Sequence, residues 1–161
     1  MGLVGALLAA LFLLISQFVG RKVEGEVVRV LDGDTIEVMQ GGKARRIRLH
    51  GVDCPEKRQP FGAAAKQFAS SRCFGKVVTV KVVDKDRYGR AVGEVILPDG
   101  ANLNRELVKA GLAWWYRQYS SDSTLGKLEE DARREKRGLW RDKSPVPPWE
   151  YREHEREGRA E

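Results

Sequence analysis

Residues 23–50 read VEGEVVRVLDGDTIEVMQGGKARRIRLH. Apolar, largely β-branched residues alternate with polar ones over three short runs, which is typical of β-strands that bury one face. The runs are separated by DGD at 32–34 and QGGK at 40–43, two sequences typical of turns. This stretch therefore predicts three consecutive strands, at 23–30, 35–39 and 46–50.

The pattern of the following residues changes from strand to helix and back. Apolar residues at helical spacing begin at Phe61 and end at Cys73, and Gly75 is a suitable stop. Beyond them, we expect strands over 76–83 and 91–97 and helices over 102–110 and 123–137. Five short strands with three helices predict an α+β protein that is mainly β, namely a closed barrel of the oligonucleotide-binding type with packed helices.

The first twenty residues differ from the rest because they contain no charged side chain. Residues 3–20 are apolar apart from Ser16 and Gln17, and this run approaches the length that crosses about 30 Å of hydrocarbon as a helix. A cleaved signal segment and a retained membrane helix both remain open. We expect the helix to be retained, with the following domain outside the cytoplasm; secretion after cleavage is the alternative.

Composition divides the remaining chain into two parts. Residues 21–143 form the expected domain, and residues 144–161 form a Pro-containing and then charged tail. The charged part after Tyr151 is expected to be either a frayed helix or disordered. With 29 Lys and Arg against 23 Asp and Glu, the net charge is +6. A basic domain suits an anionic polymer such as nucleic acid, since each neutralised phosphate releases a counterion. Basic charge kept for solubility, or for contact with anionic lipid, would look the same.

Carboxylates gather at the ends of the expected strands. Asp34 follows the first strand, while Asp53 and Glu56 follow the third. A hard cation such as calcium takes oxygen ligands at about 2.3–2.6 Å, and clustered carboxylates supply them. Arg48 and Arg90 add two guanidiniums that can bind a phosphate. Together these side chains are the inventory of metal-assisted phosphodiester hydrolysis.

Five motifs occur in a specific order along the chain. They are DGDT at 32–35, IRLHGVDCPE at 47–56, DRYGR at 86–90, NRELVKAGLA at 104–113 and EKRGLW at 135–140. Their content and order resemble the thermonuclease, or staphylococcal nuclease-like, family over residues 23–140. The resemblance implies a five-stranded oligonucleotide-binding barrel with three helices. It also implies an endonuclease that hydrolyses DNA and RNA with calcium and leaves 3′-phosphate ends.

The resemblance assigns a role to each matching position. Calcium ligands would be the carboxylates of Asp34 and Asp53 and the backbone carbonyl of Cys54, where the family often has Thr. Glu56 would activate the attacking water, although its loop up to Phe61 is shorter than expected for the family. The scissile phosphate would be held by Arg48 and Arg90, and further substrate contacts would come from Arg87, Tyr88 and Tyr119.

Two other functions stay open at this stage. The same barrel could serve as a non-catalytic nucleic-acid-binding module, or the chain could be a membrane-attached adaptor that binds a partner through its Pro-rich end. The complete set of acids and arginines favours the enzyme, and no protein partner is evident. Cys54 and Cys73 have no metal-binding spacing, and a disulfide between them is a further open possibility.

Overall fold

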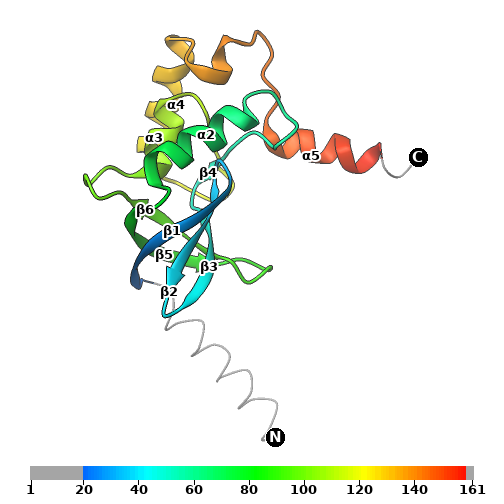
Figure 1. Ribbon diagram of the computed structural model, residues 1–161. Helices are drawn as coiled ribbons and strands as arrows, with labels where there is room; N and C mark the ends of the chain where they lie inside the picture. The colour runs from blue at the N-terminus through cyan, green and yellow to red at the C-terminus, as the bar shows by residue number, and fades with distance from the viewer. Residues whose placement is uncertain (1–19, 159–161) are drawn as a thin grey trace, which may run out of the picture.

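A computed structural model describes residues 20–158 of the chain (Figure 1). Five strands form a closed barrel in the order β1-β2-β3-β6-β5. Their bounds are Lys22–Asp32 for β1, Thr35–Gln40 for β2, Lys43–Leu49 for β3, Val77–Lys85 for β5 and Ala91–Ile96 for β6. The barrel expected from the sequence is thereby confirmed.

Antiparallel pairing joins most neighbours in the barrel, and one parallel pair closes it. Val27 of β1 faces Val38 of β2, and β3 continues antiparallel from β2. The parallel pair lies between β3 and β6, where Arg48 is the register partner of Val92. Closure leaves no free edge in the barrel, so every barrel strand is paired on both sides. It also brings the loop before β6 next to the end of β3.

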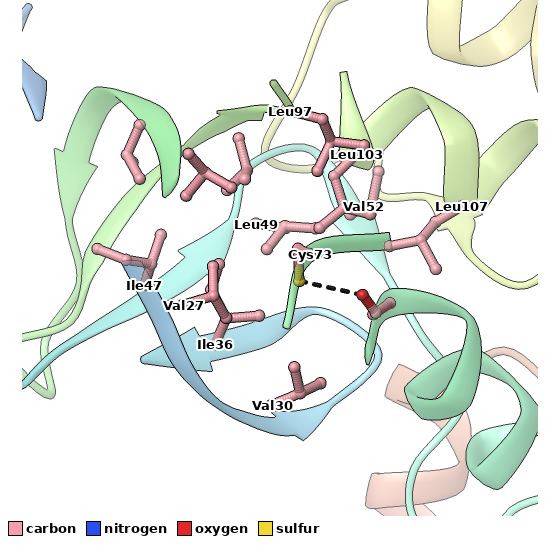
Figure 2. Close-up of a cluster of buried hydrophobic side chains, with 14 of the residues drawn as sticks. Val27, Val30, Ile36, Ile47, Leu49, Val52, Cys73, Leu97, Leu103 and Leu107 are labelled. Carbon is pink, nitrogen blue, oxygen red and sulfur yellow. Dashed lines mark hydrogen bonds between the residues drawn. The ribbon is translucent and has the colours of Figure 1, made fainter. Parts of the chain in front are cut away.

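The barrel interior is filled by the apolar face of each strand. Val27 and Ile36 are fully buried there, as the alternation in residues 23–50 predicts. Figure 2 shows these side chains together with Leu103 and Leu107, which enter the same core from a helix. One continuous core therefore joins the barrel to its helices.

All three predicted helices are present. They are α2 over Gly62–Cys73, α3 over Leu103–Lys109 and α4 over Ser123–Arg134. α2 and α3 are packed on barrel strands, and α4 is packed on α3. Asn102 caps α3 by accepting a hydrogen bond from the Arg105 backbone N–H, and Asp122 caps α4 through Thr124 N–H. α4 ends earlier than the predicted 137, and a 3₁₀ turn, η1, follows over Gly138–Arg141.

The structure also contains elements that the sequence analysis did not define. Two-residue strands β4 (Val52–Asp53) and β7 (Trp114–Trp115) pair with each other outside the barrel. A fourth helix, α5, spans Pro148–Glu157 within the expected tail, starting at a proline whose fixed φ suits the first helical turn. Figure 1 shows α5 extending away from the barrel and its covering helices.

Both cysteines are buried and free, so the disulfide considered above is not formed. Cys73 Sγ instead donates a hydrogen bond to Ala69 O at 3.0 Å, the dashed line in Figure 2. The predicted hydrophobic helix of residues 3–20 falls almost entirely outside the described residues. Within residues 20–158, no helix combines the length and the apolar character needed to cross a membrane.

Candidate active site

The tight turn between β1 and β2 fixes the first acid of the site. Asp32 Oδ1 accepts a hydrogen bond from the Asp34 N–H at 3.1 Å. Asp34 is buried, and its Oδ2 accepts from the Cys54 backbone N–H at 2.7 Å. A Cβ on Gly33 would lie only 2.8 Å from Cys54 Sγ, so glycine is needed for this close approach. The turn is thus pinned to the end of β4, and Asp34 is held beside the second acid, Asp53.

Arg48 joins the two aspartates. Its Nη2 donates to Asp53 Oδ1 at 2.8 Å, and its Nη1 lies 2.8 Å from Asp34 Oδ2. The side chains of Arg48 and Asp53 are only 16% and 1% exposed. Nη1 approaches Asp34 without the alignment of a hydrogen bond, and it has no hydrogen-bond partner among residues 20–158. Nη1 is thus paired with Asp34 by charge, and its N–H groups can still donate to an oxygen from a ligand.

Burial and mutual repulsion govern the protonation of these acids. Burial raises the pKa of Asp32 to about 7, and the neighbouring Asp34 carboxylate adds to the effect. Burial also raises the pKa of Asp53, while the hydrogen bond from Arg152 and the charge of Arg48 act in the opposite direction. Three carboxylates, those of Asp34, Asp53 and Glu56, pair with only two guanidiniums, those of Arg48 and Arg152, so an added cation would complete the charge balance.

Glu56 lies in the short loop between β4 and α2. Its backbone N–H donates to Gln59 Oε1 at 3.1 Å, and a Cβ on Gly62 would lie 2.0 Å from Glu56 O. Phe61 adopts a left-handed φ of 67°, which a non-glycine residue rarely does. The loop is therefore folded tightly against the start of α2. The Glu56 side chain remains 39% exposed and shares a cationic partner, Arg152, with Asp53.

Arg152 of α5 completes the cluster, and the sequence analysis missed it. Its Nη1 donates to Glu56 Oε1 at 2.7 Å and to Asp53 Oδ1 at 3.3 Å, while Nη2 donates to Asp53 Oδ2 at 2.9 Å. No local sequence signal marks this residue, because Glu56 and Asp53 lie nearly a hundred positions earlier. The helix start at Pro147 and Pro148 could have been predicted, but not where the helix docks.

The predicted substrate-binding residues lie in two exposed places. The guanidiniums of Arg87 and Arg90 lie over the ring of Tyr88, at 5.0 and 5.6 Å from the ring centroid. Tyr88 itself is 70% exposed. Arg90 Nε donates to Asp86 Oδ2 at 2.6 Å, so its ion pair is with its own loop and not with the acid cluster. Tyr119 is exposed and packs edge-on against Tyr116.

Known proteins resemble the chain in both sequence and length. Residues 46–142 match the family described as staphylococcal nuclease homologue. A protein of Escherichia coli O157:H7 named an uncharacterized endonuclease is 53% identical over 130 residues, which cover 81% of this chain and 85% of that protein. A micrococcal nuclease of Shigella flexneri is 38% identical over 157 residues, 91% of this chain and 90% of that protein.

The chain belongs to the staphylococcal nuclease family. The resemblance carried by the five motifs is thereby confirmed, and with it the enzyme class, a hydrolase of phosphodiester bonds. The matched range of 46–142 begins after Asp34 and ends before α5. Asp34 therefore lies before the matched range, and Arg152 lies after it.

The donor atoms of this nuclease suit a hard cation better than a soft one. Among the described residues, no group of three or more His, Cys, Asp and Glu side chains is arranged to hold a metal. The Cys54 thiol is buried, and burial raises its pKa well above the usual range, so it offers no thiolate. What remains is a pair of carboxylates, with main-chain oxygens and water to complete a shell, and such oxygen donors suit a hard cation such as calcium, magnesium or manganese better than zinc.

Proposed function

We propose that this nuclease hydrolyses DNA, RNA or both with the help of calcium, through attack of a water activated by Glu56, and leaves 3′-phosphate ends. The observation that carries the proposal is the shared guanidinium of Arg48. It holds Asp34 and Asp53 within 2.8 Å of one group, and Glu56 reaches the same cluster through Arg152. An acid pair, a base candidate and a buried cationic donor thereby lie in one place.

In this proposal Asp34, Asp53 and the Cys54 carbonyl hold calcium, which supplies positive charge next to the scissile phosphate. Arg48 Nη1 donates to a phosphate oxygen, because it is a buried donor that lacks a hydrogen-bond partner in residues 20–158. Glu56 Oε2 takes the proton of the attacking water, since Oε1 is engaged by Arg152. Negative charge that develops on the phosphoryl oxygens is then stabilised by preorganised donors. The P–O5′ bond breaks as the new P–O bond forms, and the 5′-oxygen takes up a proton from solvent and leaves as a hydroxyl.

Substrate recognition in this proposal uses the loop before β6. Tyr88 is exposed and flanked by two guanidiniums, a combination that can stack on a base and neutralise phosphates. Arg90 would turn from Asp86 to the scissile phosphate when nucleic acid binds. The parallel register of Arg48 with Val92 supports this, because Arg90 lies only two residues before Val92.

Calcium titration beside turnover tests the proposal. Glu56→Gln keeps the shape of the side chain but removes the base, and it should lower kcat by about 10²- to 10⁴-fold. Asp34→Asn and Asp53→Asn should weaken calcium binding directly, because each replaces an anionic ligand. The matched control is Glu130→Gln, an exposed change on α4 that should alter neither quantity. Near-normal turnover of Glu56→Gln would refute the proposed mechanism.

A further inference from the structure

We propose that α5 is part of the catalytic centre and that Arg152 is a positioning residue, which holds Glu56 where the attacking water must lie. This inference rests on the proposed role of Glu56 as the base. It concerns a segment outside the family match of 46–142 and a residue to which the family motifs assign no role.

Two separate ties connect the Glu56 loop to the C-terminal segment. The first is the ion pair between Arg152 Nη1 and Glu56 Oε1 at 2.7 Å. The second runs through Gln59, which is buried: its Oε1 accepts from Glu56 N–H at 3.1 Å, and its Nε2 donates to Val146 O at 2.5 Å. The backbone of Glu56 is therefore tied, through Gln59, to the segment before α5, and the side chain of Glu56 is tied to α5 itself.

Aromatic packing fixes the position of α5 itself. The ring of Trp149 stacks on Tyr116 at 5.2 Å with an interplanar angle of 6°, and it meets Trp114 edge-on at 5.6 Å. Such ring contacts stabilise the packing beyond what the buried area of the rings contributes. Arg152 follows Trp149 by three residues, which places both side chains on the same face of the helix. Docking of the tryptophan therefore delivers the guanidinium to the acids.

Arg152 is also the only side chain, within residues 20–158, that pairs with the Glu56 carboxylate. A glutamate on a loop would otherwise sample several rotamers, and fixing it costs side-chain entropy. The ion pair with Arg152 already restricts the Glu56 rotamer in the folded enzyme, so this entropy is not lost again when substrate binds. Because misplacement of a reacting group by about 1 Å can lower a rate by roughly 10²-fold, a contact of this kind acts on kcat.

The contact with Asp53 leaves room for a cation. An ionised carboxylate has about four lone-pair positions. Asp53 accepts three hydrogen bonds, two at Oδ1 from Arg48 and Arg152 and one at Oδ2 from Arg152. One position at Oδ2 remains, so Arg152 and calcium can share this side chain. The opposite idea, that Arg152 blocks the cation, becomes an outcome of the experiment.

The experiment compares Arg152→Ala, Arg152→Met and Arg152→Lys in the full chain with Arg156→Ala. Arg156 is an exposed arginine four residues further along α5, so its removal changes the charge of the same helix equally. We expect kcat to fall about 10- to 100-fold in the Ala and Met variants with KM within twofold of the parent. The Lys variant should recover part of the loss, and millimolar methylguanidinium should partly restore Arg152→Ala. The control should be unaffected.

Two measurements without turnover complete the test. Hydrogen exchange of residues 55–62 in calcium-free protein should be faster in Arg152→Ala and Arg152→Met than in Arg156→Ala. Calcium affinity should stay within threefold of the parent. Tenfold tighter calcium binding with higher turnover would overturn the inference and make α5 a block. Turnover and exchange equal to those of Arg156→Ala would also overturn it, while an inactive Glu56→Gln would leave the proposed function standing. An active Glu56→Gln would instead remove the base that both rest on.

Discussion

Replacement of Arg48 by methionine would leave two buried carboxylates without the guanidinium that joins them. Asp34 and Asp53 both lie within 2.8 Å of Arg48, and Asp53 is almost fully buried. Removing one partner from a buried ion pair costs about 3–5 kcal/mol, because the remaining charge stays desolvated. Arg152 still pairs with Asp53, so we expect the lower end, about 3 kcal/mol of unfolding free energy in chelator.

Calcium should recover much of this loss, because it supplies the missing positive charge. A ligand that binds only the folded state stabilises it by about 2.7 kcal/mol at a hundredfold excess over its Kd. Urea unfolding with chelator and with calcium measures both quantities. The matched control is Arg46→Met on the same strand, since Arg46 is exposed and its pair with Glu37 is worth at most about 1 kcal/mol. Equal losses in the two variants, with equal responses to calcium, would refute this reasoning.

Three further outcomes are expected. Burial raises the pKa of Cys73 to about 11, so only about one Cys73 thiol in a thousand is ionised at pH 8. Iodoacetamide should therefore label neither buried cysteine in the native protein and both in denaturant, and a single labelled thiol under denaturation would contradict this. Tyr88→Ala should weaken binding of single-stranded nucleic acid by about 1–3 kcal/mol with little change in stability, as measured by fluorescence anisotropy; unchanged affinity would remove the stacking role. The apolar run of residues 3–20 predicts that the full chain partitions with membranes on cell fractionation, and recovery in the soluble fraction of a chain that retains those residues would contradict it.

The sequence predicted the barrel well because each strand buries one face and turns separate the strands. Val27 and Ile36 lie inside as the alternation requires, and Asp34 and Asp53 meet as strand-end acids should. The strands β4 and β7 were beyond such reasoning, since a period of two needs more than two residues to be recognised. Trp114 of β7 is buried, and its pairing partner, Asp53, is more than sixty positions away.

The arginines show where motif reasoning stops. Arg90 matches a family position, yet Asp86 lies four residues before it in the same motif and pairs with it in the structure. A sequence can show that such a neighbouring acid is available to pair with the arginine, but it does not show which ion pair forms. Arg152 lies in a tail whose composition is charged throughout, and α5 buries only Pro148. Its docking depends on Trp149 meeting Tyr116, a tertiary contact that no local periodicity encodes.

The ion pair between Arg152 and Glu56 spans 96 positions of the chain. Synthesis proceeds from the N-terminus, and domains generally begin to fold in that order. The barrel strands, which end at Ile96, are therefore translated before Arg152. A newly made molecule thus passes through a stage in which it has its acids but lacks one of the guanidiniums that neutralise them. Proteolytic trimming of the tail would remove the same guanidinium from a mature molecule.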